Sequence, residues 1–270
     1  MLAHELGPAL ERRGWTVLVL RRAACDITDE AAVRERVAAW GRGLVVNCAA
    51  YTKVDRAEQE PEQAFAANAR GAGHVARAAA SSGARLVHVS TNAVFDGALR
   101  RPYLETDPET PLGVYGCSKH AGELEVAASG AEAYVVRTGH LYGDGGHNFF
   151  DKLSARAREG GALRVVDDPI VAPTWTRDLA EQLALLVESQ PPGLYHAMAT
   201  GEASWYRIAR EALQALRLDA PVQPVSTEEY GSPTPRARYS ILANQALERA
   251  GICRMRPWEV ALAEWLGNRS

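Results

Sequence analysis

The chain has few cysteines, few lysines and no long apolar run. Its four cysteines in 270 residues lie far apart and form no CxxC pair, which argues against a disulfide framework or a metal centre and favours reduced thiols. No apolar run approaches the roughly 20 residues that a membrane-spanning helix needs, and the N-terminus lacks the pattern of a signal peptide. We therefore expect a cytoplasmic protein that does not bind membranes.

Neither sign of charge is in excess. The chain has 30 basic and 33 acidic residues, a formal net charge of -3, and only three lysines among the basic residues. This balance leaves no overall excess of positive charge of the kind that binds nucleic acid. Apolar residues make up 47% and charged residues 23%, which is ordinary globular composition and suits one large or two small domains.

Short valine-rich runs alternate with longer amphipathic stretches in the first half of the chain. The runs, which are typical of buried parallel strands, cover residues 16–20, 44–49, 85–90 and 133–138. Helical patterns cover residues 2–13, 29–41, 61–82 and 114–130. This alternation predicts an α/β fold with a Rossmann-type, doubly wound parallel sheet that has helices on both faces.

The pattern changes after residue 142. Helices are predicted near 148–159, 176–189, 204–217 and 257–267, and strands near 163–166 and 193–197. We expect a smaller C-terminal substrate domain interleaved with the sheet. The dinucleotide-binding domain would comprise 1–142 and about 164–196, and the substrate-binding domain about 143–163 and 197–270.

The sequence begins inside the predicted first helix. In doubly wound folds a central first strand ends in a glycine-rich turn that holds a pyrophosphate at the N-terminus of that helix. No such strand or GxxGxxG string is present here. We expect upstream codons to encode a strand ending in GxxG; the alternative is a protein without this phosphate cradle.

Two sequence features could carry chemistry. Tyr115 and Lys119 lie four apart on a predicted helix, so they share a face, and a nearby ammonium lowers the pKa of a phenol toward a working proton donor. Ser90 and Thr91 end a predicted strand, where open α/β sheets bind ligands. A chance pair and a simple turn are the respective alternatives.

Two further strings follow predicted strands. The small residues in 47–55 would let a flat ligand approach closely, although tight helix packing would also explain them. Asp26 and Ile27 could hold an adenine, or they could belong to a helix-capping region.

Together these strings resemble the extended short-chain dehydrogenase/reductases, and most closely the dTDP-4-dehydrorhamnose reductase family. The resemblance covers nearly the whole chain. It rests on Asn68 and on CDITD (25–29), VVNCAAYTKVDRAE (45–58), HVSTNAVFDG (88–97), YLETD (103–107), PLGVYGCSKHAGE (111–123), VVRTGHLYG (135–143), APT (172–174) and ASWYRIARE (203–211).

The resemblance implies a reaction of dTDP-rhamnose biosynthesis, the NAD(P)H-dependent reduction of the C4 ketone of a nucleotide-linked 6-deoxysugar. By that resemblance Tyr115 would protonate the forming alkoxide, and Thr91 would hold the carbonyl oxygen. Lys119 would lower the pKa of Tyr115 and bind the nicotinamide ribose. These three residues are the expected catalytic set.

The resemblance also implies two binding sets. The expected cofactor residues are Met1, Leu2, Arg21, Arg22, Asp26, Ile27, Ala49, Ala50 and Tyr51, with Tyr115 and Lys119; the expected substrate residues are Thr52, Val54, Thr91, Asn92 and His140. Arginines after the second strand suit a ribose 2′-phosphate. They favour NADPH, with NADH as the alternative.

Three departures from the family pattern lie near the expected substrate. Asn92–Ala93 replace an acid and a tyrosine, Gly139–His140 replace a serine and a tryptophan, and Pro169–Ala172 replace a glutamine and a glycine before Pro173–Thr174. The identity of the sugar and of the nucleotide therefore stays open. A sugar-nucleotide epimerase, a non-catalytic regulatory subunit on the same scaffold, and a homodimeric state also stay open. A dehydratase is disfavoured, because Asn92 and Ala93 stand where such enzymes carry an acid pair.

Overall fold

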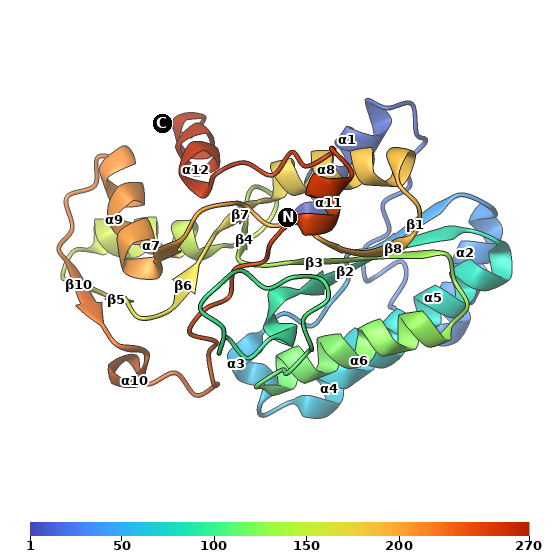
Figure 1. Ribbon diagram of the computed structural model, residues 1–270, viewed down its shortest axis with the longest axis horizontal. Coiled ribbons are helices and arrows are strands. Elements are labelled where there is room, and N and C mark those ends of the chain that lie inside the picture. Colours follow the sequence, from blue (N-terminus) through green and yellow to red (C-terminus); the bar gives the residue numbers. More distant parts are fainter. Residues whose placement is uncertain (270) are drawn as a thin grey trace.

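The computed structural model describes residues 1–269. Its larger part is a parallel sheet with the strand order β1-β2-β3-β8 and helices on both faces (Figure 1). The strands are β1 (Leu44–Asn47), β2 (Arg85–Thr91), β3 (Ala133–Thr138) and β8 (Gly193–His196). The predicted Rossmann-type fold is confirmed.

Two helical layers cover this sheet. Helices α1 (Leu2–Glu11) and α8 (Thr176–Ser189) pack on one face through Leu6, Leu10 and Leu183. The opposite layer contains α2 (Glu30–Trp40), α5 (Gly71–Ser82) and α6 (Val114–Ala128). Burial on both faces explains why the strands read as continuous valine-rich runs rather than as an alternation of polar and apolar residues.

The connection between β1 and α5 is helical with one irregular turn. It contains α3 (Val54–Ala57), α4 (Pro61–Phe65) and a π-helical turn at Ala66–Arg70 that leads directly into α5. The helix predicted over 61–82 is therefore present, with a π turn inside it. Such turns often occur at functional sites, and this one carries the buried Asn68.

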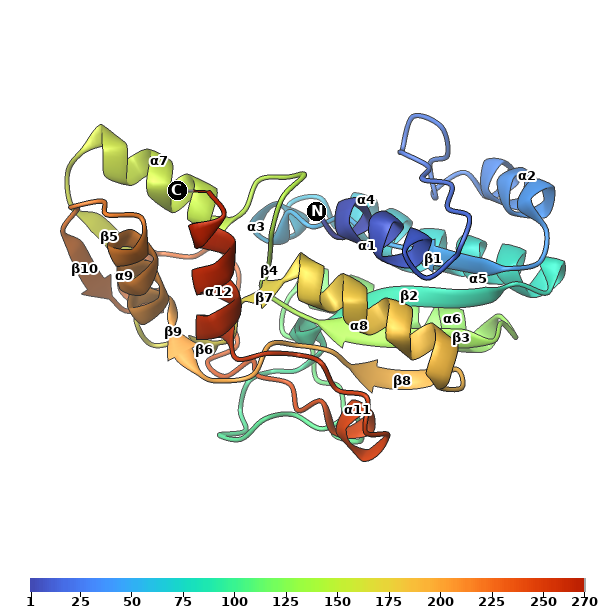
Figure 2. The ribbon, with the colours of Figure 1, turned by 90° about the horizontal axis from the view of Figure 1, so that it is seen from above.

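The smaller part lies beyond the carboxyl ends of β2 and β3, on the left in Figure 2. Its helices are α7 (Phe149–Glu159), α9 (Trp205–Ala215), α10 (Thr227–Tyr230) and α12 (Trp258–Gly267), and its strands include β5 (Leu163–Val166) and β10 (Val222–Val225), which pair in parallel. Of the short elements, β4 (Leu141–Tyr142) pairs with β7 (Thr174–Trp175), and β6 (Ile170–Val171) pairs with β9 (Ala203–Ser204). Helix α11 (Gln245–Arg249) lies against β8 of the larger part. Trp258 and Trp265 are fully buried in the core of the smaller part.

Strand β5 spans the expected domain boundary near residue 164. That boundary falls inside β5, whose partner β10 belongs to the smaller part. We therefore propose that the chain returns to the larger part after β5 rather than at its start.

The predicted strand at 16–20 is not a strand in the structure. These residues are extended but belong to none of the sheets, and Leu18 and Val19 are 56% and 55% exposed. An apolar run forms a strand only when a neighbour supplies hydrogen-bond partners. Within residues 1–269, β1 pairs only with β2, and its other edge faces an open slot beside residues 16–20.

Candidate functional site

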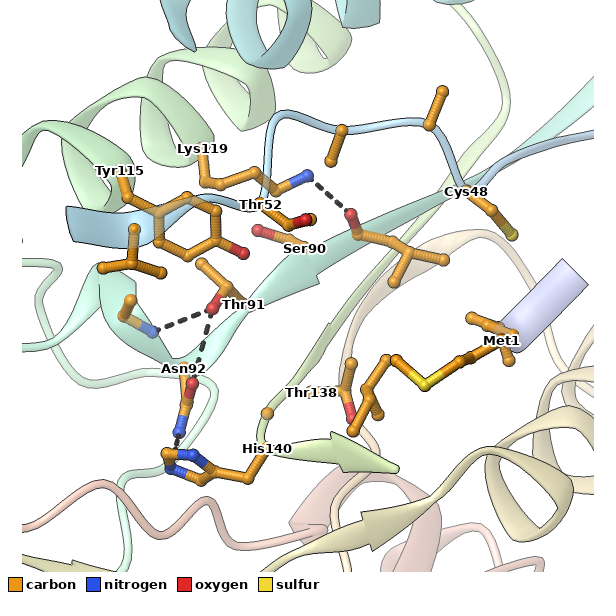
Figure 3. A pocket seen from close by; sticks show the side chains of 18 of the residues that line it. Met1, Cys48, Thr52, Ser90, Thr91, Asn92, Tyr115, Lys119, Thr138 and His140 are labelled. Carbon is orange, nitrogen blue, oxygen red and sulfur yellow. Dashed lines mark hydrogen bonds between the residues drawn. The ribbon is translucent and has the colours of Figure 1, made fainter. Parts of the chain in front are cut away.

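A cavity of about 1850 Å³ opens at the carboxyl ends of β2 and β3, reaches residues of the smaller part, and continues along the slot beside residues 16–20. Thr91 ends β2, while Tyr115 and Lys119 come from the first turns of α6, and all three line the cavity. The Tyr115 hydroxyl points toward Thr91 in Figure 3. The structure thus brings the three expected catalytic residues to one wall.

Two glycines let α6 approach closely enough to form this wall. A Cβ atom at Gly116 would lie 2.3 Å from the carbonyl oxygen of Ala93, and one at Gly122 would lie 2.0 Å from that of Asn68. Any larger residue at either position would push the helix away from the end of β2. The position of Tyr115 beside Thr91 therefore depends on its glycine neighbours as well as on its own side chain.

Thr91 and Tyr115 form the polar end of the wall. The Thr91 hydroxyl oxygen accepts a hydrogen bond from the Ala93 amide at 3.1 Å and donates one to Asn92 Oδ1 at 3.4 Å. Burial raises the pKa of Tyr115, and a hydrogen bond with Thr91 opposes that shift. Tyr115 is therefore a protonated phenol at neutral pH.

The Lys119 ammonium is buried and bound to the backbone of β2. Its Nζ donates to the carbonyl oxygen of Val89 at 2.7 Å, and burial lowers its pKa to about 8. The expected effect of Lys119 on the pKa of Tyr115 stays a prediction; burial is the larger influence on that phenol and raises its pKa.

The loop after β1 lines the cavity beside the N-terminal end of α6. Asn68 holds it: Asn68 Oδ1 accepts from the Tyr51 amide at 2.7 Å, and Asn68 Nδ2 donates to Ser118 Oγ at 2.9 Å. The expected residues Ala49, Ala50, Thr52 and Val54 line the cavity. Tyr51 does not, because its hydroxyl turns away and donates to Glu60 Oε2 at 2.6 Å.

The residues expected at the adenosine end lie along the open slot. Met1 and Leu2, in the first turn of α1, line the cavity together with Asp26 and Ile27. Arg22 also lines it, and its Nε donates to Asp26 Oδ2 at 2.8 Å. Arg21 is not part of the lining.

Asn92 and His140 form one network at the junction with the smaller part. His140 Nε2 lies 2.9 Å from Ser240 Oγ and 3.2 Å from Asn92 Nδ2, and Asn92 Nδ2 donates to the Ser240 carbonyl at 2.8 Å. A Cβ at Gly139 would lie 2.5 Å from the Asn92 amide, so Gly139 makes room for this contact. Burial lowers the pKa of His140 to about 4, which keeps the imidazole neutral.

The structure adds residues that the sequence interpretation missed. The rings of Phe149 and Trp205 pack 4.4 Å apart, and the Trp205 ring meets that of His140 edge-on. Lys152 and Arg156, one helical turn apart on α7, line the same region. Their i, i+4 spacing was visible in the sequence, but their direction required the packing of α7 beside the cavity.

The profile of the RmlD substrate binding domain family matches residues 1–270. The chain belongs to this family. It is 44% identical to a Streptomyces griseus protein named dTDP-4-dehydrorhamnose reductase, over 98% of this chain and 89% of that protein. It is 40% identical to the Bacillus subtilis spore coat polysaccharide biosynthesis protein SpsK, over 100% and 94% of the two chains.

The solved structures include a member of the RmlD family in a cofactor complex. The Bacillus anthracis dTDP-4-dehydrorhamnose reductase, crystallised with NADP, superposes with a TM-score of 0.93 at 34% identity, over 98% of this chain and 95% of that one. In the part of the chain that the structure describes, no helix is long and apolar enough to cross a bilayer, and no cluster of His, Cys, Asp and Glu could hold a metal ion.

Proposed function

We propose that this protein uses NADPH to reduce the C4 ketone of a dTDP-linked 6-deoxyhexose. The observation that carries the proposal is the convergence of Thr91, Tyr115 and Lys119 on one wall of a single large cavity. The cavity reaches from the loop after β1 to the smaller part, so a dinucleotide and a sugar nucleotide could each meet part of its lining. Family membership supports the same reaction.

The residues on the slot side of the cavity fit a dinucleotide. Ala49 and Ala50 leave space for a flat ring, the N-terminus of α1 favours phosphate, and Arg22 can meet a 2′-phosphate. Ile27 and Asp26 complete the proposed adenosine end, and the backbone of Tyr51 fixes the loop. When bound, NADPH supplies the hydride.

The chain's own residues then bind the C4 oxygen and transfer a proton to it. Thr91 and Tyr115 hold the C4 oxygen, and the Tyr115 hydroxyl delivers the proton to it. Tyr115 is protonated at neutral pH, so it starts in the form that a proton donor needs. Lys119 places a positive charge behind the phenol and offers N–H groups to the nicotinamide ribose.

The smaller part offers the chemistry that a nucleoside diphosphate needs. Among residues 1–269, Lys152 and Arg156 form no ion pair, so their charges are free to meet a diphosphate. Phe149 and Trp205 present ring faces for stacking. The network of Asn92 and His140 can donate or accept hydrogen bonds at the sugar, and Thr52 and Val54 close the cavity opposite it.

The test is NADPH consumption with a dTDP-4-keto-6-deoxyhexose, compared among wild type, Tyr115→Phe and Tyr51→Phe. Loss of a positioned proton donor costs about 10²–10⁴-fold in rate, so Tyr115→Phe should lose most activity. Tyr51→Phe is the matched control, because that hydroxyl contacts Glu60 outside the cavity lining. It should retain activity.

Two results would contradict the proposal. Release of an epimerised sugar without net NADPH consumption would favour an epimerase. NADPH binding without turnover of any 4-keto sugar nucleotide would favour a non-catalytic role for this scaffold.

A further inference from the structure

Helix α6 carries a third polar residue on the same stripe as Tyr115 and Lys119. Glu123 follows Lys119 by four residues, as Lys119 follows Tyr115, so all three point to one side of the helix. Glu123 is only 8% exposed. A buried carboxylate is costly unless it is paired, and its partners indicate why it is there.

The first partner of Glu123 is the strand that carries the reacting end of the site. The Ser90 hydroxyl donates to Glu123 Oε1. Ser90 lies between Val89, whose carbonyl accepts the Lys119 ammonium, and Thr91, which faces Tyr115. The Glu123 carboxylate thus links α6 to Ser90, whose two neighbours on β2 face Lys119 and Tyr115.

The second partner is Arg137 on β3, which is 1% exposed. Arg137 Nε donates to Glu123 Oε1 at 3.0 Å, and Arg137 Nη2 donates to Glu123 Oε2 at 2.6 Å. The same guanidinium also binds Glu109 and lies 5.2 Å from the centre of the Phe95 ring. This two-pronged contact fixes the orientation of the Glu123 carboxylate.

Three titratable groups face Lys119, and Glu123 is the carboxylate among them. Lys119 faces the Cys48 thiol from the loop after β1, the His88 ring from β2, and Glu123 from its own helix. Burial raises the pKa of Cys48 to about 11 and lowers that of His88, so both are neutral at pH 7. Within residues 1–269, Glu123 is the anion that opposes the effect of burial on Lys119.

We propose that Glu123 is a positioning residue for the reduction: it holds Val89–Thr91 against α6 and keeps the buried Lys119 positively charged. This role rests on the proposed reductase function for its catalytic consequence. The effect on the charge of Lys119 can be measured without any activity.

The experiment compares Glu123→Gln with the matched control Glu109→Gln. Each variant removes one carboxylate from Arg137, but Glu109 forms no hydrogen bond with Ser90 and does not act on the charge of Lys119. The first readout is the pH titration of lysine side chains labelled with ¹³C. The chain has only Lys53, Lys119 and Lys152, so each signal can be assigned by a Lys→Arg variant.

We expect the pKa of Lys119 to fall by about one pH unit in Glu123→Gln, because a buried opposite charge one helical turn away favours the charged form, and to stay in place in Glu109→Gln. The alkaline limb of the kcat–pH profile should move to lower pH by the same amount. A purely structural role would lower activity or the melting temperature without moving either curve.

An unchanged Lys119 titration in Glu123→Gln overturns the proposal, whatever happens to the activity. If that variant does not fold because Arg137 is left with too little counter-charge, Glu123→Gln/Arg137→Gln removes both charges and should show a shift of the same sign. Inactive wild type with a shifted Lys119 titration would refute the reductase function but leave the charge effect standing.

Discussion

The sheet has a closed side and an open side. On the closed side β2 is paired on both edges, by β1 and β3, and Leu86 and Val87 are buried. On the open side, within residues 1–269, β1 is paired along one edge only, and residues 16–20 lie across a slot with Leu18 and Val19 more than half exposed.

The two sides of the sheet carry different groups of the proposed site. Thr91, Tyr115 and Lys119 are held by the closed side, whereas Arg22 and Asp26 follow the open segment. The proposed catalytic groups are therefore supported by β2, which is hydrogen-bonded to a neighbouring strand along both edges.

The largest expected difference between the two sides is in amide hydrogen exchange. Local opening free energies run from about zero in loops to the global value in core strands, so amides of residues 16–20 should exchange about 10³-fold faster or more than those of 86–90. Exchange measured by NMR or mass spectrometry tests this. Equal protection of the two segments would mean that residues 16–20 are paired in solution.

A pair of leucine substitutions sharpens the same comparison in stability. Leu86→Ala removes a fully buried side chain and should lower the free energy of unfolding by about 3 kcal/mol. Leu18→Ala truncates a side chain that is 56% exposed and should change it by about 0.5 kcal/mol or less. Urea denaturation of both variants supplies the numbers; similar losses would contradict the contrast.

The histidine beside the substrate network gives a pH-dependent prediction. The pKa of His140 is about 4 in the folded state and about 6.5 when unfolded, so the unfolded chain takes up its proton first as the pH falls. Its contribution is intact above pH 6.5 and is lost between about pH 6.5 and 4, at a cost of about 3 kcal/mol.

The matched variant is His140→Asn, since asparagine tolerates the left-handed backbone that His140 adopts at φ 52°. Denaturation at several pH values should give a shallower acid slope for this variant. A slope identical to that of wild type would show that His140 titrates normally in the fold.

The smallest expected effect concerns the open side. Arg22 is the arginine of the Arg21–Arg22 pair that lines the cavity, and its side chain is 84% exposed. Arg22→Ala should weaken NADPH binding by about fivefold, equivalent to about 1 kcal/mol, and leave NADH binding unchanged. Arg21→Ala is the control and should alter neither affinity. Fluorescence titration with both cofactors measures the four constants.

Local patterns predicted the residues whose neighbours are close in sequence. Tyr115 and Lys119 are one helical turn apart, and Thr91 ends a run that any parallel sheet would bury. The Glu123–Arg137 pair was not predictable in this way, because it needs β3 beside β2 and α6 above both.

Two of the positions where prediction and structure differ have one cause in common. The run at 16–20 has the composition of a strand, but a partner edge, not composition, decides pairing. Tyr51 follows a strand as expected, yet Glu60, nine residues later, draws its hydroxyl out of the cavity. In both cases the deciding contact lies outside the pattern that suggested the role.

The most direct test of the proposed reaction follows the hydride itself. The protein is incubated with a dTDP-4-keto-6-deoxyhexose and NADPH that carries deuterium on the transferable position of the nicotinamide, and the sugar is analysed by NMR. We expect one deuterium at C4 of the reduced sugar for each NADPH consumed. A sugar that returns without deuterium at C4, under conditions where NADPH is bound, would contradict the assignment of this protein as a C4 ketone reductase.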